Sequence, residues 1–308
     1  MSASWWNALS VLPTLFLAPL LLGIIGKTKA LVAGRKGAPL LQPYRDLYRL
    51  MGKGAVYSRT TTWVFRAAPS VSLGSLLLAC LMLPAGPLGA PLAFPGDLVL
   101  FAYLLALGRF AVVAGALDTG SAFEGMGASR EAAFSAFAEP GFFLVLGVLA
   151  WKEQATSLGP ILASADVISW GGQIPSLALA AGALYLILLA ENSRIPVDDP
   201  TTHLELTMIH EVMVLDHSGP DLAFILYGSA LKMWLFGAVL VSILMPAQGT
   251  AWASTALFLG GMAVVAVSVG LVESFMARLR LSRVPQYLGL AAVLAGLAAL
   301  LLMTGGKP

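Results

Sequence analysis

Charged residues are scarce in this chain of 308 residues. They make up 11% of it, whereas 58% of the residues are hydrophobic, and soluble domains carry charge on about a quarter of their residues. The composition therefore excludes a soluble domain and indicates an integral membrane protein. Cysteine is nearly absent as well: the single Cys80 lies in an apolar segment, so neither an internal disulfide nor a cysteine metal cluster is possible.

Several catalytic signatures are also missing. No Walker A or dinucleotide-binding glycine pattern occurs, no serine lies in a nucleophile elbow, and His210-Glu211 lacks the second histidine of HExxH. The three histidines His203, His210 and His217 are seven residues apart, which is about 10.5 Å along a helix and too far to share a metal. We expect no metal, no catalytic residue and no nucleic-acid partner. No internal repeat supports an inverted-repeat transporter.

Long apolar runs are abundant instead. A membrane-spanning helix needs about 20 mostly apolar residues, and uninterrupted runs of this kind exclude barrel strands. The sequence therefore predicts an all-α polytopic protein, with residues 1–308 forming one transmembrane domain and with no cleaved signal at the start. The eight predicted spans are Trp5 to Gly26, Ala67 to Leu88, Asp97 to Leu117, Phe137 to Trp151, Ile174 to Ala190, Leu222 to Met245, Trp252 to Val272 and Val284 to Met303.

The basic residues predict the orientation. Eight spans place both termini on one side, and Lys152 and Lys307 are the only bases there, whereas the other 16 of 18 lie on the opposite side. By the positive-inside rule the basic side is cytoplasmic, so both termini are expected outside a cytoplasmic (inner) membrane. The predicted cytoplasmic loops are residues 27–66, 118–136, 191–221 and 273–283.

Two of these loops carry opposite charge. The first holds nine bases against one acid, Asp46, and the third holds seven acids against Arg194. One interpretation is topology determination with attraction to anionic lipid; the other is a docking platform for a soluble partner. The candidate docking residues are Arg35, Lys36, Arg45, Asp46, Arg194, Asp198, Asp199, His203, Glu205, His210, Glu211 and Asp216.

The acidic third loop is expected to contain a helix. Asp199 suits an N-cap and Pro200 the first helical position, and Gly219 and Pro220 follow a predicted end near Asp216. Such a helix would place the three histidines near one face.

Charges in or beside the spans form a second set of candidates. An ionisable group at the centre of a spanning helix costs about 2.5 to 3.5 kcal/mol, so each needs a reason. Snorkelling or a structural ion pair is one explanation, and a proton relay between acids at several helix ends is the other. The relay candidates are Glu139, Glu191, Glu273, Asp118, Glu124, Arg109 and Lys232.

Two motifs resemble a known family. The run from Glu191 to Trp234, ENSRIPVDDPTTHLELTMIHEVMVLDHSGPDLAFILYGSALKMW, and the run GRKGAPLLQPYRDLYRL from Gly34 to Leu50 resemble the membrane subunit of group 4 [NiFe] hydrogenases. That subunit, of the formate hydrogenlyase and hydrogenase-4 type, is homologous to subunit 1 of respiratory complex I. Glu139 in AEPGFF resembles a helix-start glutamate of complex I relatives. The residues TTHLELTMIHE after Asp199 follow the hydrogenase pattern, not the more acidic one of complex I.

The resemblance implies a non-catalytic subunit of an oxidoreductase complex. It would anchor the soluble hydrogenase module and couple the redox reaction to movement of H⁺ or Na⁺. The implied partners are the hydrogenase large and small subunits, a ferredoxin-like Fe–S subunit, antiporter-like membrane subunits and the lipid bilayer. The nickel-iron centre and Fe–S clusters would lie in the partners, with no cofactor in this chain. The alternatives are a quinone-chamber subunit of a complex I-like dehydrogenase and an independent secondary transporter.

Overall fold

Helices joined by turns and irregular segments make up the part of the chain that the structure describes. The computed structural model describes residues 11–85, 89–164, 171–199, 208–245 and 251–305, and these contain eight helices long and apolar enough to cross a membrane. This confirms the all-α class and the eight predicted spans. The eight are α2 (Val11–Val32), α4 (Trp63–Cys80), α5 (Asp97–Asp118), α6 (Ala122–Glu153), α9 (Ile174–Glu191), α11 (Gly219–Leu244), α12 (Ala251–Phe275) and α13 (Val284–Gly305).

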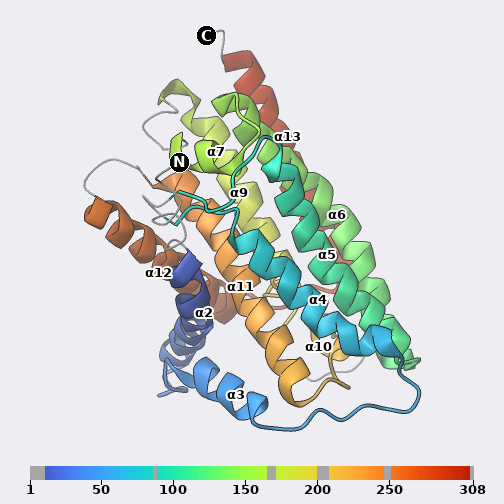
Figure 1. Cartoon of the computed structure of the whole chain (residues 1–308). Helices are drawn as coiled ribbons and strands as arrows, with labels where there is room; N and C mark the ends of the chain where they lie inside the picture. Colours follow the sequence, from blue (N-terminus) through green and yellow to red (C-terminus); the bar gives the residue numbers. More distant parts are fainter. Residues whose placement is uncertain (1–10, 86–88, 165–170, 200–207, 246–250, 306–308) are drawn as a thin grey trace.

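Short helices connect the spans. They are α3 (Gln42–Met51), α7 (Leu158–Ser164), α10 (His210–Met213) and the 3-10 turns η1 (Gly171–Gln173) and η2 (Leu281–Arg283). Helix α11 lies centrally, with α2 and α12 on one side and α4, α5 and α6 on the other (Figure 1). It is apolar on all sides, as a helix surrounded by other helices must be, and Trp234 is buried near its middle.

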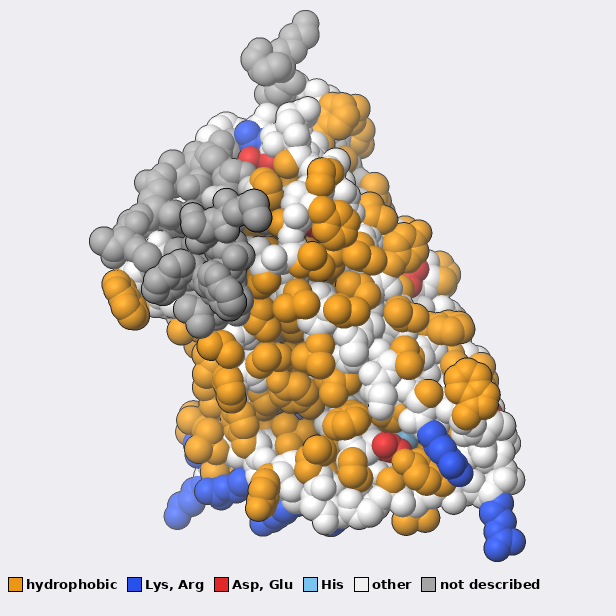
Figure 2. Space-filling view, viewed as in Figure 1, with side chains coloured by type: hydrophobic (Ala, Val, Ile, Leu, Met, Phe, Trp, Pro, Cys, Tyr) orange, Lys and Arg blue, Asp and Glu red, His pale blue; other side chains and the backbone are white. Residues whose placement is uncertain are grey.

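The outer surface of the helices is apolar between two polar ends. Figure 2 shows hydrophobic side chains over the flank of the molecule and Lys and Arg gathered along its lower edge. Exposed aromatic residues occur at both ends of the helix bundle. Trp63 at the start of α4 and Phe275 at the end of α12 lie at one end. Trp151 near the end of α6 and Trp252 near the start of α12 lie at the other. Aromatic belts of this kind mark the two membrane–water interfaces.

A proline within α2 is matched by a tyrosine from α11. Pro19 has no N–H to give the Leu15 carbonyl four residues earlier. The Tyr227 hydroxyl donates to that carbonyl over 2.8 Å. The bond satisfies the acceptor that the proline leaves free and fastens α2 to the central helix.

The fourth span is much longer than predicted. It is continuous from Ala122 to Glu153, so most of the expected loop 118–136 is helical. Its first turns carry Glu124 and Arg130, which lower the local hydropathy, but both have partners: Glu124 accepts the N–H of Asp216, and Arg130 donates to the Met208 carbonyl. Satisfied polar side chains allow the helix to continue where composition predicted a loop.

Two further boundaries differ from the prediction. The second span begins at Trp63 instead of Ala67, because the Thr62 hydroxyl caps it by accepting the N–H of Val64. It ends at Cys80, shortly before Pro84. The first span continues to Val32, beyond the predicted end at Gly26.

The prediction of a helix from Pro200 to Asp216 is wrong for the part of this segment that the structure describes. Residues 208 and 209 are not helical, and α10 contains only four residues. The Asp198 carboxylate accepts the N–H of Asp199 and also that of His210, over 2.9 and 3.1 Å. One side chain therefore binds the backbone on both sides of the undescribed residues. Residues 200–207, with His203 and Glu205, lie outside the described residues.

The positions of the loops give a labelling prediction. In a Cys80→Ser background, Lys36→Cys should react with a membrane-impermeant thiol reagent only from the cytoplasm, and Gly172→Cys only from outside. Both positions are exposed; Lys36 follows the end of α2, and Gly172 precedes the start of α9 at the opposite end of the bundle. Intact spheroplasts and inverted vesicles distinguish the two. Labelling of Lys36→Cys in intact spheroplasts would overturn the orientation.

Candidate functional site

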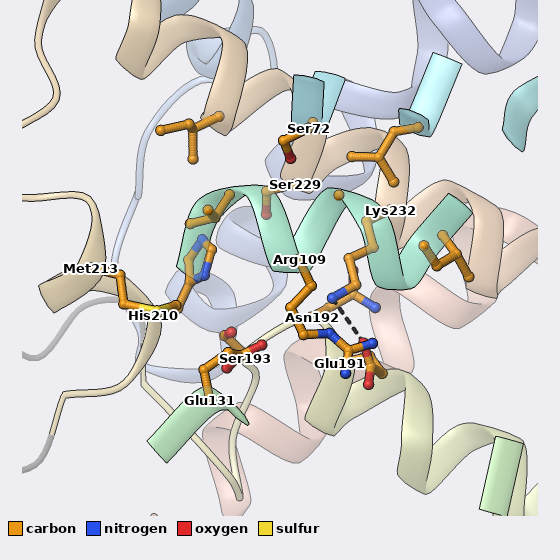
Figure 3. A pocket seen from close by; sticks show the side chains of 16 residues that line it. Ser72, Arg109, Glu131, Glu191, Asn192, Ser193, His210, Met213, Ser229 and Lys232 are labelled. Carbon is orange, nitrogen blue, oxygen red and sulfur yellow. Dashed lines mark ion pairs between the residues drawn. The ribbon is translucent and has the colours of Figure 1, made fainter. Parts of the chain in front are cut away.

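Ionisable side chains from five helices converge on one internal cavity. Its charged walls are Arg109 on α5, Glu131 on α6, Glu191 at the end of α9 and Lys232 on α11, with His210 of α10 at its edge. Figure 3 shows Arg109 and Lys232 directed toward Glu191. The cavity extends from the end of α9, where Glu191 is the last residue, to the middle of α5 and α11, where Arg109 and Lys232 lie.

Glu191 is the centre of the charge cluster. Its carboxylate lies 2.9 Å from the Lys232 ammonium and 3.1 Å from the Arg109 guanidinium. The side chain of Glu191 is 6% exposed, whereas Glu139, which pairs with the other terminal nitrogen of Arg109 at 3.2 Å, is 44% exposed. Withdrawing such charges from water costs several kcal/mol per ion, so they persist only when paired. The acids and bases of this cluster therefore depend on one another.

Helical spacing places these residues on the cavity wall. On α11, Ile225, Gly228, Ser229 and Lys232 recur at intervals of three or four and share one face. On α5 a glycine, Gly108, lines the cavity where α4 approaches. A Cβ there would lie 2.8 Å from the Ser75 hydroxyl, so a larger residue would have to displace that hydroxyl. The small residues leave the room that the long charged side chains occupy.

The cavity is of a size for water. About 50 Å³ of it is open to the centres of water molecules, and one water needs about 10–15 Å³ by this measure. A second cavity between α6, α13 and the loop after α9 shares Glu131, Glu191 and Ser193 with the first and reaches Asp198. The two cavities therefore meet at a pair of shared carboxylates, Glu131 and Glu191.

Glu131 is a cavity residue that the sequence analysis did not single out. It lines both cavities and lies within electrostatic reach of Lys232, Arg109 and Glu191. A signal is present in the sequence, since Glu131 and Glu139 are eight residues apart and therefore share a helix face. This spacing did not identify Glu131, because the sequence analysis placed residue 131 in a loop and not in a helix.

Glu273 belongs to a different cluster. Its fully buried carboxylate pairs with Lys29 at 2.8 Å and with Arg194 at 3.3 Å. These bonds join the end of α2, the end of α12 and the loop after α9. Glu273 does not line the cavity around Glu191.

The two remaining relay candidates also lie elsewhere. Asp118 accepts the N–H groups of Thr62 and Phe65 and the Thr62 hydroxyl, over 2.7 to 3.2 Å, at the start of α4. Glu124 is buried and accepts the N–H of Asp216. Each of them ties a helix end to a neighbouring segment, and neither lines the cavity.

The candidate docking residues divide into exposed and buried ones. Arg35, Lys36, Arg45 and Asp216 are exposed; Asp46, Asp199, His210 and Glu211 are intermediate; Arg194 and Asp198 are largely buried. Asp198 differs most from the expectation of a surface residue. Besides its two backbone bonds it pairs with Arg278 at 2.8 Å, and burial raises its pKa. It joins the loop after α9 to the loop after α12.

The described histidines do not share a face. His210 lines the cavity, whereas His217 is buried and stacks on Phe65 with ring centroids 4.0 Å apart. Burial and the nearby Lys232 lower the pKa of His210 to about 4. Burial likewise lowers the pKa of His217. Among the described residues no group of three His, Cys, Asp or Glu could hold a metal ion.

The fold and the site define a polytopic membrane protein with a cluster of paired ionisable residues inside its helix bundle. The chain belongs to the NADH dehydrogenase family, whose family model matches residues 6–304. A solved chain from the membrane-bound sulfane sulfur reductase, an archaeal respiratory membrane complex, shares this fold. The TM-score is 0.82 at 21% identity, covering 98% of this chain and 100% of that one.

Two relatives from Escherichia coli (strain K12) are similar over most of their length. Formate hydrogenlyase subunit 4 is 33% identical over 87% of this chain and 89% of its own, and hydrogenase-4 component C is 31% identical over 94% and 93%. An NADH-quinone oxidoreductase subunit from Anaplasma phagocytophilum (strain HZ) is 25% identical over 66% and 62%. The chain is thus a membrane subunit of the kind found in hydrogenase and complex I-like assemblies.

The low pKa of His210 predicts a pH-dependent stability. The unfolded histidine takes up a proton below its ordinary pKa of 6.5, but the folded one does so only below about 4. Stability is therefore full above pH 6.5 and falls as the pH drops, by about 2 kcal/mol at pH 5. The thermal midpoint of the purified chain in detergent should fall less between pH 7 and pH 5 in His210→Gln than in the native protein. Equal falls would contradict a buried, neutral His210.

Proposed function

We propose that this chain is the membrane-anchoring and coupling subunit of a membrane-bound [NiFe] hydrogenase complex of the formate hydrogenlyase or hydrogenase-4 type. The observation that carries the proposal is the Glu191 carboxylate held by Arg109 and Lys232 beside a water-sized cavity. Similarity to the two Escherichia coli subunits supplies the class of complex.

The coupling role follows from how such a cluster responds to charge. In a low dielectric, a change in the charge or position of one member alters the proton affinity of the others. Glu131 lines both cavities together with Glu191. Glu139, which is more exposed, pairs with the guanidinium of Arg109, the base that also binds Glu191. A redox event in a partner that moves the loop at His210 would shift protons along these acids. Antiporter-like membrane subunits would convert that shift into movement of H⁺ or Na⁺.

The anchoring role belongs to the cytoplasmic loops. Arg35 and Lys36 follow α2 and are exposed, as is Asp216 before α11. Exposed charges of both signs fix the orientation of a docking protein. The proposed partners are the hydrogenase large and small subunits and a ferredoxin-like Fe–S subunit. These would hold the nickel-iron centre and the Fe–S clusters.

A second candidate function is the quinone-chamber subunit of a complex I-like dehydrogenase. The similarity to a subunit of an NADH-quinone oxidoreductase favours it. The charged cavity, with about 50 Å³ open to water centres, argues for protons and water instead of a quinone ring. Quinone-dependent turnover of the purified complex would favour this second candidate.

The coupling proposal is tested by neutralising an acid of the cavity. Glu131→Gln keeps the size of the side chain but cannot exchange a proton, so hydrogen evolution should remain near the native rate while coupled ion movement falls at least several-fold. Both are measured on the same inverted vesicles, with acidification followed by a fluorescent dye. Glu139→Gln should behave in the same way.

Glu153→Gln is the matched control, because Glu153 lies at the other end of the same helix α6 and outside both cavities. It should leave the ratio of ion movement to hydrogen evolved unchanged. If Glu131→Gln and Glu139→Gln also keep the native ratio, these acids are structural and the coupling proposal fails.

The anchoring proposal is tested by charge reversal on the exposed loop. Arg35→Glu combined with Lys36→Glu should lower the amount of hydrogenase subunits that copurify with this chain at low salt, and the difference from the native chain should shrink as salt screens the surface charges. Lys152→Glu, at the opposite end of the bundle, should have no such effect. Native yields of the soluble subunits from the double variant would show that this surface does not hold them.

A further inference from the structure

Helix α3 (Gln42–Met51) carries an outward groove that the rest of the described chain does not cover. The groove is lined by Leu41, Tyr44, Arg45, Tyr48 and Arg49. Spacings of three and four residues bring these side chains to one side of the helix. Tyr48 is 83% exposed, and its apolar neighbours Leu41 and Met51 are exposed as well. A helix with large apolar side chains facing outward needs something to cover them.

The same groove holds two guanidinium groups without an acid. Arg45 and Arg49 are one helical turn apart and exposed, and neither forms an ion pair with any described residue. The one acid on the helix, Asp46, is bonded to the Gln42 amide over 2.8 Å. The groove therefore offers two positive charges next to aromatic and aliphatic surface.

The groove lies at the boundary between the lipid-facing surface and the basic end of the molecule. The Tyr44 hydroxyl donates to the Phe16 carbonyl on α2, and the Phe16 side chain is 68% exposed on a helix that can span the membrane. Helix α3 lies beside α11 and at the level of its first turns (Figure 1). An amphipathic helix with basic and aromatic side chains at this height lies in the membrane interface.

We propose that this groove binds an anionic phospholipid. The phosphate would accept hydrogen bonds from Arg45 and Arg49, whose planar guanidinium groups match phosphate oxygens in pairs. The glycerol backbone would lie against Tyr48 and Leu41, and the acyl chains would continue along the exposed apolar surface of α2. An acidic soluble protein would match the charges but not the continuity with the apolar surface around Phe16.

The experiment compares lipid retention between variants that keep the helix. Arg45→Gln combined with Arg49→Gln removes both charges, and glutamine is a good helix former. The full chain is purified in mild detergent from membranes rich in phosphatidylglycerol and cardiolipin, and bound lipids are quantified by mass spectrometry. We expect the variant to retain several-fold less anionic lipid than the native chain. Arg59→Gln combined with Arg283→Gln, both exposed and outside the groove, is the matched control and should retain the native amount.

A second measurement separates a bound lipid from a protein partner. In nanodiscs of phosphatidylcholine, adding phosphatidylglycerol should raise the thermal midpoint of the native chain and of the control but not that of Arg45→Gln/Arg49→Gln. Equal retention and equal shifts in all three would overturn the proposal. So would loss of copurifying soluble subunits from the groove variant with lipid retention intact, because the groove would then be a protein contact.

Discussion

A single carboxylate shared by two bases holds the interior of this protein together. Glu191 ends α9, and its partners Arg109 and Lys232 come from the middle of α5 and α11. Each ion alone would cost several kcal/mol in so apolar a surrounding, and removal of one partner leaves the others uncompensated. Loss of any one of the three charges should therefore destabilise the contact between these helices. The water-sized cavity lies beside the three charges.

The other acids hold loops in place around that centre. Asp198 closes the loop after α9 and fastens it to Arg278, Glu273 ties Lys29 to Arg194, and Asp118 caps α4. All of these bonds lie at the end of the bundle where the cavity opens. The loop that carries His210 to the cavity wall is thus held at several points.

The spans could be predicted from the sequence because lipid imposes one requirement on every residue of a helix. The same reasoning marked Arg109, Lys232 and Glu191, since a charge in a span must have a partner. It could not say which acid each base meets, because that depends on helix packing. Asp118 and Glu273 look like Glu191 in the sequence. Asp118, however, caps helix α4, and Glu273 pairs with Lys29 near the end of α2 and with Arg194 in the loop after α9. Glu131 was hidden because polar residues early in α6 resemble a loop until their partners are known.

The basic residues of the first loop have different environments, which their number in the sequence does not reveal. By sequence its nine bases form one positive surface. In the structure Lys29 is bound to the buried Glu273, Arg66 stacks on Tyr57, Arg45 and Arg49 face a groove bordered by apolar residues, and Arg35 and Lys36 are open to solvent. The first two have contacts within the chain, so they stabilise the fold. Arg45 and Arg49 are suited to binding lipid. Arg35 and Lys36 are suited to binding a soluble partner. The two explanations for the loop, lipid attraction and docking, are therefore compatible, because different residues of the same loop are available for each.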